Sequence, residues 1–347
     1  MPSPGGATVA LDGRGAEQGA EALIAGARSA AADGIRLRVF GDTAMLEPLA
    51  GVDGIELVDA PGEITNDDEP VVAVRSREDA SIVMAAADVA AGTSDALVSA
   101  GPTGATMTAA LFALRRSQGV RRPALTVQLP TPGGSGPPTV MLDVGANTEA
   151  RSGDLVQFAY LGSAFSQLVL DVERPRVALL SIGEEASKGT SQLVDAHATL
   201  GQASGLNFRG NVEGRDLLAD GADVVVTDGF TGNVVLKTLE GTARAVGDAV
   251  AGAARSNPVA AAGGLLLRPA LGGLRREVDP DSTGGAILLG LRGVAVVAHG
   301  SSGPDGIANA VRLAARAVEQ RAVERTGELL ESENATRGSL RGDTNDE

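Results

Sequence analysis

Short apolar runs rich in β-branched residues alternate along the chain with longer, alanine-rich amphipathic stretches. The runs typical of strands are TVAL (8–11), LRVF (37–40), ALVSA (96–100), ALTVQL (124–129), TVMLDV (139–144), RVALLSI (176–182), DVVVT (223–227) and VAVVAH (294–299). The stretches with helical periodicity lie at 15–32, 77–91, 103–116, 154–170, 192–203, 232–253 and 304–321. Because the runs are almost wholly apolar, both faces of their sheet must be covered. The alternation predicts an α/β fold, with helices on both faces of a largely parallel sheet.

Length, charge and cysteine content limit the function. The chain has 347 residues, of which 43% are hydrophobic, so it can bury a substantial core. Its formal net charge of -15 disfavours nucleic-acid binding, which needs a basic face. The absence of cysteine excludes disulfides, thiolate metal sites and a cysteine nucleophile. The opening letters MPSPGG lack the pattern of a secretory signal, so a cytoplasmic location is expected.

Two segments depart from the α/β rhythm. Residues 252–283 are rich in Gly, Pro and Arg, and we expect them to form an arm that protrudes from a single domain spanning residues 1–323. Residues 324–347 are polar and mixed in charge, which predicts a disordered tail.

Lysine and histidine are unusually scarce. Lys188 and Lys237 are the only lysines among 29 basic residues, and His197 and His299 are the only histidines. In a chain so biased towards arginine, a retained lysine points to a position that needs a compact ammonium group. His299 follows a predicted strand, where α/β proteins bind ligands. His197 lies on a predicted helix, where a structural role is expected instead.

The segment DGFTGN, residues 228–233, follows an apolar run and opens a long predicted helix. Glycines there let the backbone approach an anion, and the amides of Gly232 and Asn233 would lie at the positive end of the helix dipole. Lys237 follows about one turn later. The structural alternative is that Asp228 caps the helix. This segment alone does not choose between anion binding and capping.

Similar glycine-rich corners follow other predicted strands. They contribute Gly101, Thr103 and Gly104 from SAGPTGA, Asp143, Gly145 and Asn147 from LDVGAN, Gly183, Glu184, Glu185 and Lys188 from SIGEEASKG, and His299 and Ser301 from AHGSS. Each corner alone is a weak signal, because connecting loops favour Gly, Asn and Ser. Together they predict one shared anion-binding site at the carboxyl edge of the sheet.

Several other kinds of site are disfavoured. The chain has no GxxxxGK[ST] phosphate loop, no GxGxxG after its first strand and no GxSxG elbow. Asp143, Asp228, Glu184 and Glu185 offer oxygen ligands, but adjacent glutamates usually point apart, so no metal is predicted. Nucleotide hydrolysis, dinucleotide binding and serine hydrolysis are therefore not expected.

Six longer motifs follow one another between about residues 95 and 316: SAGPTGA, LDVGAN, RVALLSIGEEASKG, NFRGNVEGRDL, DVVVTDGFTGNVVLKTLEG and GGAILLGLRGVAVVAHGSS. This series resembles the bacterial phosphate acyltransferase family of phospholipid synthesis. The resemblance implies an isopropylmalate-dehydrogenase-like α/β fold, related to phosphotransacetylases, in a homodimer. It implies transfer of a fatty acyl group from acyl carrier protein to inorganic phosphate, which gives acyl phosphate. It also implies peripheral membrane association and no cofactor.

Site roles follow from combining the resemblance with the residues. Phosphate is itself a nucleophile, so positioning and oxyanion stabilisation suffice without a cysteine. We expect Lys188 and the amides around Asn233 to bind phosphate, and His299 to donate a hydrogen bond or proton to the carbonyl oxygen or leaving thiolate. Asn147 and Asn211 are expected to orient the substrate. The remaining expected substrate-binding residues are Gly101, Thr103, Gly104, Gly183, Glu184, Asp228, Gly232, Lys237 and Ser301.

The chain departs from the family pattern in places. Pro102 stands where the motif SAGNTGA has Asn, and only Asp12 and a nearby glycine match an expected N-terminal DAMGGD. Two alternatives therefore remain: a weakened paralogue that serves as a dimeric scaffold for carrier protein or lipid enzymes, and a decarboxylating dehydrogenase of the same fold. For an acidic carrier protein, the docking candidates are arginine clusters at 115–122 and 268–276. The arm is expected to serve the dimer, the acyl chain or a membrane surface.

Overall fold

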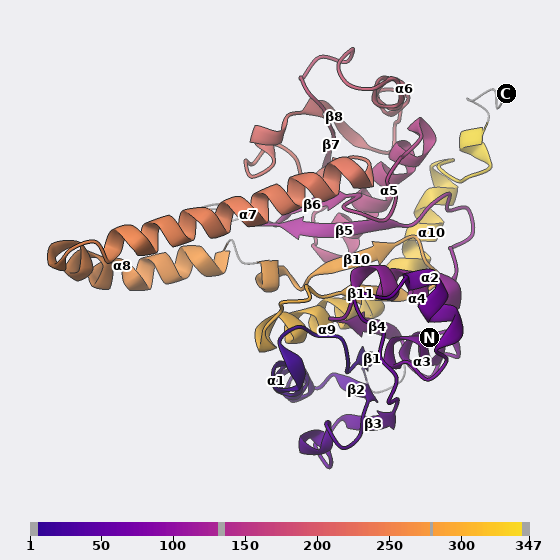
Figure 1. The fold of residues 1–347 in the computed structure, drawn as a ribbon. Coiled ribbons are helices and arrows are strands. Elements are labelled where there is room, and N and C mark those ends of the chain that lie inside the picture. The colour runs from indigo at the N-terminus through magenta and orange to yellow at the C-terminus, as the bar shows by residue number, and fades with distance from the viewer. Residues whose placement is uncertain (1–5, 131–135, 278–279, 342–347) are drawn as a thin grey trace.

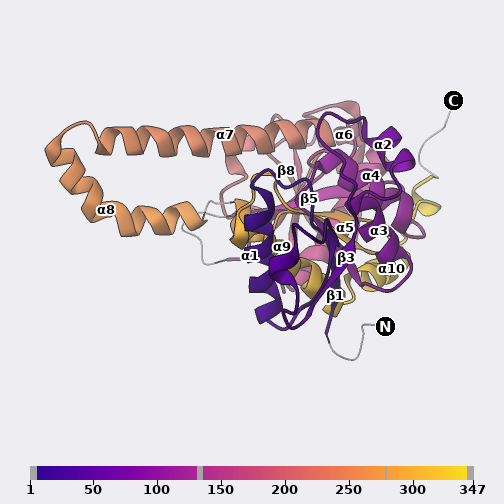
Figure 2. The same cartoon turned by 60° about the horizontal axis from the view of Figure 1, so that its bottom comes forward.

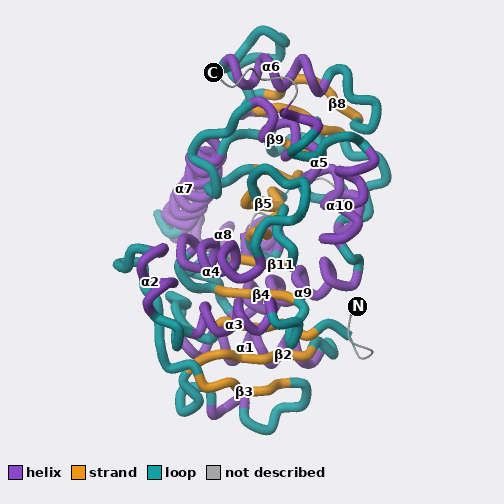
Figure 3. Tube along the Cα trace, turned by 90° about the vertical axis from the view of Figure 1, so that its right-hand side faces the viewer, coloured by secondary structure: helices purple, strands orange, loops and turns teal. Residues whose placement is uncertain are grey.

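A single eleven-stranded sheet runs through the molecule, in the order β3-β2-β1-β4-β11-β10-β5-β6-β9-β7-β8. The computed structural model describes residues 6–130, 136–277 and 280–341, and side chains within 6–130, 136–267 and 282–340. The strands are β1 (Thr8–Asp12), β2 (Arg36–Gly41), β3 (Ile55–Asp59), β4 (Ala96–Ser99), β5 (Ala124–Leu129), β6 (Thr139–Leu142), β7 (Arg176–Leu180), β8 (Asn207–Val212), β9 (Val224–Val226), β10 (Ala286–Leu289) and β11 (Val294–Val297). Figure 3 follows them from β3 at one end of the molecule to β8 at the other.

The sheet is largely parallel, as predicted, but its direction reverses in the middle. Strand β10 is antiparallel to both β11 and β5, and β6 is antiparallel to β5. The carboxyl ends of β1, β4 and β11 therefore meet at one edge, which we call the β4 edge. The carboxyl ends of β6, β9 and β7 meet at the opposite edge, which we call the β9 edge. The prediction that all the glycine-rich corners share one edge is wrong.

Helices cover both faces of the sheet. They are α1 (Gly19–Ala32), α2 (Pro70–Ser76), α3 (Ser81–Ala90), α4 (Thr103–Leu114), α5 (Ser152–Val169), α6 (Ser191–Leu200), α7 (Gly229–Ala254), α8 (Pro258–Glu277), α9 (Pro304–Glu319) and α10 (Ala322–Ser332). Side chains alternate across a strand. In β1, Val9 and Leu11 accordingly join a core with α1, α5 and α9, whereas Ala10 joins a second core with α3 and α4.

Helices α7 and α8 extend away from the body as a pair, and two views show them side by side (Figures 1 and 2). The arm predicted at residues 252–283 is therefore a helical hairpin that also includes the outer half of α7. Val246, Val250, Val259 and three consecutive leucines, Leu265 to Leu267, are exposed on it. Among the described residues, no helix combines the length and the apolar character needed to cross a membrane.

The C-terminal segment is folded over its described part, so the prediction of a disordered tail from residue 324 is corrected there. Helix α10 packs against α5, and Leu330 and Ala335 are each 1% exposed. The amide of buried Gln157 on α5 donates to the carbonyl of Ala335 over 2.8 Å. A few apolar residues in a polar segment are enough to anchor it. Residues 342–347 of the predicted tail lie outside the described residues.

Candidate active site

The loops that follow β1, β4 and β11 pack together at the β4 edge. Ser99 pairs with Val297, and the amide of Ala298 donates to the carbonyl of Ser99 over 2.8 Å. Gly101 and His299, each two residues beyond this pair, therefore leave neighbouring strands at the same level. A Cβ on Gly15 would lie 2.9 Å from the Cα of Gly101, so the β1 loop comes too close to the β4 loop to leave room for a side chain at residue 15.

A buried carboxylate holds these loops in place. Asp12 is 3% exposed and accepts hydrogen bonds from the hydroxyls of Ser81, over 2.6 Å, and Ser99, over 2.7 Å. The hydroxyl of Ser99 in turn accepts from the amide of Gly101 over 3.0 Å and from the hydroxyl of Thr106 over 3.1 Å. Burial raises the pKa of Asp12 to about 6, although these hydrogen bonds favour its charged form.

Asp12→Asn is expected to change how stability depends on pH. Because the pKa of Asp12 is about 6 in the folded chain, above the ordinary 3.8, the native state binds this proton more tightly than the unfolded state. The protonated carboxyl of Asp12 stabilises the fold below pH 4. As pH rises to 6 this contribution is lost, which lowers the free energy of unfolding by about 3 kcal/mol. Denaturant unfolding of wild type and variant between pH 4 and 6 measures the difference. Parallel curves for the two proteins would contradict it.

Helix α4 begins with free backbone donors at the β4 edge. The amides of Thr103, Gly104 and Ala105 precede its first internal hydrogen bond, from Thr106 to the carbonyl of Pro102. None of the three bonds to another group in the part of the chain that the structure describes. Pro102 occupies the N-cap position, and it has no side-chain group that could cap the helix. This end of α4 therefore keeps donors for an anion.

A second group of charges joins α7 to β11. The ammonium of Lys237 lies 2.9 Å from Oε2 of Glu240, and Nε2 of His299 lies 3.7 Å from the same oxygen. Burial raises the pKa of Glu240, but hydrogen bonds from His299 and Lys237 outweigh it and leave that pKa below its usual range. Glu240 is thus charged at neutral pH and positions both groups.

The ring of His299 has a defined orientation. Its Nδ1 accepts a hydrogen bond from the amide of Ser301 over 3.2 Å and lies 2.8 Å from the hydroxyl of the same residue. An Nδ1 that accepts carries no proton in the neutral ring, so the proton is on Nε2, which faces Glu240. His299 therefore presents an N–H donor beside Lys237.

Helix α7 spans the distance between the two edges. Asn233, Lys237 and Glu240 are spaced i, i+4 and i+7, so they form one stripe about 10 Å long on the helix. At its start, the side chain of Asn233 lies 3.8 Å from the position of a Cβ on Gly145, at the β9 edge. At its end, Glu240 meets His299 at the β4 edge. Residues that the strand directions separate are linked by this stripe.

The corner at the start of α7 is built for packing. Helix α7 starts at Gly229, and the amide of Gly232 donates to the carbonyl of Asp228. The amides of Gly232 and Asn233 therefore belong to the hydrogen-bonded helix and are not free for an anion. That prediction is wrong, because the helix starts earlier than its periodicity indicated. A Cβ on Gly232 would lie 1.8 Å from the carbonyl oxygen of Asp143. The side chain of Asp228 accepts from the amide of Thr231, as the capping alternative predicted.

Asp143 organises this corner. Its buried carboxylate accepts from the amide of Asn147 over 2.7 Å and from the side-chain amide of the same residue over 2.8 Å. Burial raises the pKa of Asp143, while hydrogen bonds from Ala146 and Asn147 oppose the shift. The carbonyl of Asn147 accepts from the amide of Gly229 over 2.8 Å, which fixes the first residue of α7.

The loop after β7 makes local contacts. The side-chain amide of Asn211 donates to the carbonyl of Glu185 over 2.9 Å, and Glu184 lies 3.8 Å from Arg215. A Cβ on Gly183 would lie 3.0 Å from the side chain of Lys188. The structure thus brings these predicted residues together at the β9 edge, apart from His299. In the described residues, no cluster of three or more Asp, Glu and His could hold a metal ion.

The comparisons with known proteins give one family. A family model described as fatty acid synthesis protein matches residues 7–325. A phosphate acyltransferase of Elusimicrobium minutum is 43% identical over 319 residues, covering 90% of this chain and 92% of the relative. One from Heliobacterium modesticaldum is 42% identical, covering 90% and 94%. The chain belongs to this phosphate acyltransferase family. It is therefore an enzyme of the acyltransferase class.

Solved structures agree with this family's expected fold. The chain is similar to the EutD phosphotransacetylase from Staphylococcus aureus, with a TM-score of 0.59, 19% identity and coverage of 90% and 94% of the two chains. A branched-chain phosphotransacylase from Enterococcus faecalis gives 0.58 at 17% identity, covering 90% and 99%. At such low identity these likenesses show the fold alone. They confirm the predicted α/β fold, which is similar to that of phosphotransacetylases.

Some site residues of this acyltransferase carried no clear sequence signal. Glu240 follows Lys237 by three residues, a spacing at which opposite charges meet on a helix, and that spacing could have pointed to it. Ser81 and Ser99 lie far apart in the sequence and meet only through Asp12. No local pattern predicts such a contact.

Proposed function

We propose that this chain transfers a fatty acyl group from acyl carrier protein to inorganic phosphate and so supplies acyl phosphate for phospholipid synthesis. Membership of the phosphate acyltransferase family supports the reaction class. The observation that carries the site is the contact of Lys237 and His299 with one oxygen of Glu240. His299 follows β11, which pairs with β4, the strand that leads into the open start of α4. A cation for phosphate and a donor for the thioester are thus held next to each other.

The reaction needs few groups from the protein. A phosphate oxygen attacks the thioester carbonyl carbon, and the carbonyl oxygen becomes an oxyanion. The carbon–sulfur bond then breaks, and the thiolate takes a proton as carrier protein leaves. In our proposal Lys237 and the amides of Thr103 and Gly104 hold the phosphate. The Nε2–H of His299 donates a hydrogen bond to the oxyanion, and the proton that hydrogen phosphate brings passes to the leaving thiolate.

Two lysine variants test where phosphate binds. Lys237→Ala is expected to raise the KM for phosphate roughly tenfold or more, because a hydrogen bond to a charged group is lost. Lys188→Ala is expected to leave that KM within about twofold, because its loop bonds to its own neighbours. The rate at which acylated carrier protein is converted to free carrier protein, measured at a series of phosphate concentrations, gives the KM for phosphate of both variants. A raised KM for Lys188→Ala with an unchanged KM for Lys237→Ala would instead place the phosphate beside Lys188, the residue expected from the sequence, at the β9 edge.

We also propose that the protein works as a homodimer and that the arm takes part in its contacts. The exposed side chains of Val259 and Leu265 to Leu267 give the arm an apolar surface suited to a second copy or to the surface of a membrane. Burial against a second copy is the version we favour. The arm arginines Arg268, Arg275 and Arg276, predicted as carrier-protein contacts, have side chains outside the described residues.

A further inference from the structure

A basic pocket of about 660 Å³ opens at the β9 edge, between the end of α4, the start of β5 and the start of α5. Its lining residues are Leu111, Arg115, Arg116, Arg121, Arg122, Pro123, Asn147, Arg151, Asp154 and Arg337. Six of these are arginines, brought together from segments far apart in the sequence. In a chain with a formal net charge of -15, so dense a cluster of guanidinium groups calls for an explanation.

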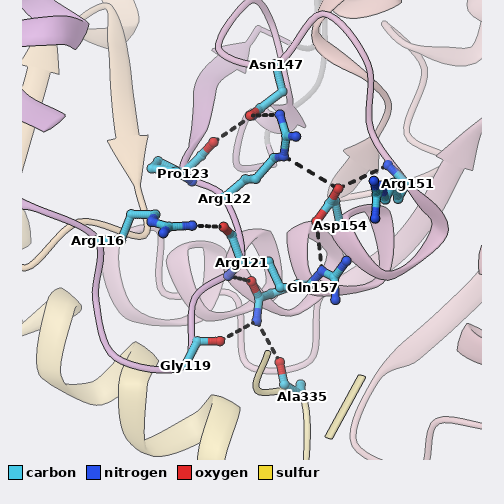
Figure 4. A network of polar contacts seen from close by, with 10 residues as sticks. All are labelled: Arg116, Gly119, Arg121, Arg122, Pro123, Asn147, Arg151, Asp154, Gln157 and Ala335. Carbon is cyan, nitrogen blue, oxygen red and sulfur yellow. Dashed lines mark hydrogen bonds and ion pairs between the residues drawn. The ribbon is translucent and has the colours of Figure 1, made fainter. Parts of the chain in front are cut away.

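The pocket holds more positive charge than its own acid can neutralise. Asp154 is the one carboxylate in the lining, and its side chain is 3% exposed. Its two oxygens lie 2.8 Å from Nε of Arg121 and 3.8 Å from Nε of Arg122, so it is already shared (Figure 4). No carboxylate pairs with Arg115, Arg116 or Arg337 in the described part of the chain.

The arginine-bearing loop is fixed rather than freely mobile. The amide of Arg121 donates to the side chain of Gln157 over 2.6 Å, and Gln157 donates to the carbonyls of Gly119 and Ala335 (Figure 4). Gln157 is fully buried. The amide of Arg337 donates to Gly119 over 2.6 Å, so the C-terminal segment adds its arginine to the pocket through a backbone contact. A preformed cluster of this kind reduces the entropy lost when a ligand binds.

Hydrogen bonds connect the pocket to the start of α7. A guanidinium nitrogen of Arg122 lies 3.4 Å from the side-chain oxygen of Asn147, whose side-chain amide also donates to Asp143. The carbonyl of Asn147 accepts from Gly229, the first residue of α7. A ligand on Arg122 would therefore be linked through Asn147 to the first residue of α7, the helix that carries Lys237 and Glu240.

We propose that this pocket binds a small anion of the phosphate class. Guanidinium forks match phosphate oxygens two at a time, and the guanidinium groups without a carboxylate partner suit a ligand that carries more than one charge. The volume falls within the range of small-molecule sites, and the apolar side chains of Leu111 and Pro123 suit the body of such a ligand. Because the arginines converge on a concave site, a small anion fits better than the carrier-protein surface expected from the sequence.

The test measures pyrophosphate binding to the full chain by titration calorimetry, with inorganic phosphate in a parallel arm. The double variant Arg115→Gln/Arg337→Gln removes two guanidinium groups and leaves Arg121, Asp154 and Gln157 intact. We expect its affinity to fall about a hundredfold, roughly tenfold for each arginine. Arg316→Gln, at an exposed position on α9, is the control for one lost charge and is expected to bind as wild type.

The two arms identify the anion. Tighter binding of pyrophosphate indicates a ligand with two or more phosphate groups, and equal binding indicates inorganic phosphate; either supports the proposal if the double variant loses it. Binding that the double variant retains, or that only Lys237→Ala removes, overturns it. So does a wild type that binds neither anion, or a double variant impaired only towards acidic carrier protein. These readouts need no acyl transfer, so failure of the proposed reaction would be seen separately.

Discussion

Replacing His299 with alanine is expected to lower kcat for acyl transfer about a hundredfold to a thousandfold. The imidazole is held by Ser301 with its Nε2 proton facing Glu240, whose same oxygen contacts Lys237, and in our proposal the oxyanion forms beside it. Removing one hydrogen-bond donor to an oxyanion lowers kcat by factors of about this size. The KM for phosphate should change little, because Lys237 and the start of α4 remain. Steady-state kinetics with saturating acylated carrier protein and varied phosphate measures both kcat and the KM for phosphate.

His197→Ala is the matched control, since it removes the other histidine. His197 lies edge-on to Phe208, with ring centroids 5.1 Å apart, which is a packing contact on α6. We expect this variant to lose some stability and keep its kcat. If both variants kept wild-type turnover, or if His299→Ala changed only the melting temperature, His299 would have a structural role.

Gly232→Ala is expected to destabilise the fold by about 3 kcal/mol. The added Cβ would lie 1.8 Å from the carbonyl oxygen of Asp143, and a backbone carbonyl in a hydrogen-bonded corner cannot move aside cheaply. Gly241→Ala on the same helix is the control, because nothing lies within 4 Å of its Cβ. There the substitution should be neutral or stabilising by about 0.5–1 kcal/mol, since alanine favours helix more than glycine does.

Chemical denaturation of the two alanine variants measures this contrast. Equal stability of Gly232→Ala and Gly241→Ala would show that the first turn of α7 does not pack against β6 as described. An inactive but fully stable Gly232→Ala would instead favour the interpretation in which this glycine lies against a bound anion.

The strands with continuous apolar runs could be predicted from sequence, and the less regular ones could not. Strand β3 has the sequence IELVD and is only partly buried, while β8 has NFRGNV with polar residues throughout. Neither shows the apolar run that marked the central strands. Strand β10 is short and follows Gly284 and Gly285, both with positive φ. Two adjacent glycines indicate a turn, so the sequence there did not predict a strand.

Missing β10 had the largest consequence for the site. This strand and the antiparallel β5–β6 pair reverse the direction of the sheet, and no local pattern reveals which way a strand runs. The glycine-rich corners were recognised correctly as strand ends, but their division between two edges depends on tertiary topology. Gly101, Thr103, Gly104, His299 and Ser301 lie at the β4 edge, and Asn147, Lys188, Asn211 and Asp228 lie at the β9 edge.

The polar stripe of α7 was partly visible in the sequence. Lys237 stood out because lysine is so rare here, and its distance from DGFTGN placed it one turn along the helix. Its partner Glu240 was not predicted, because its role depends on contact with His299 across the fold. Likewise, Asp12 was recognised only as a remnant of a motif, whereas the structure shows it holding Ser81 and Ser99.

The most direct measurement follows the oxygen atoms of phosphate. The purified chain is incubated with acyl carrier protein carrying a fatty acyl group and with phosphate labelled with ¹⁸O at all four positions, and the products are analysed by mass spectrometry. Attack by phosphate predicts acyl phosphate that retains every labelled oxygen, formed in parallel with free carrier protein. Release of unlabelled fatty acid with no acyl phosphate, or no loss of the thioester, would contradict the account.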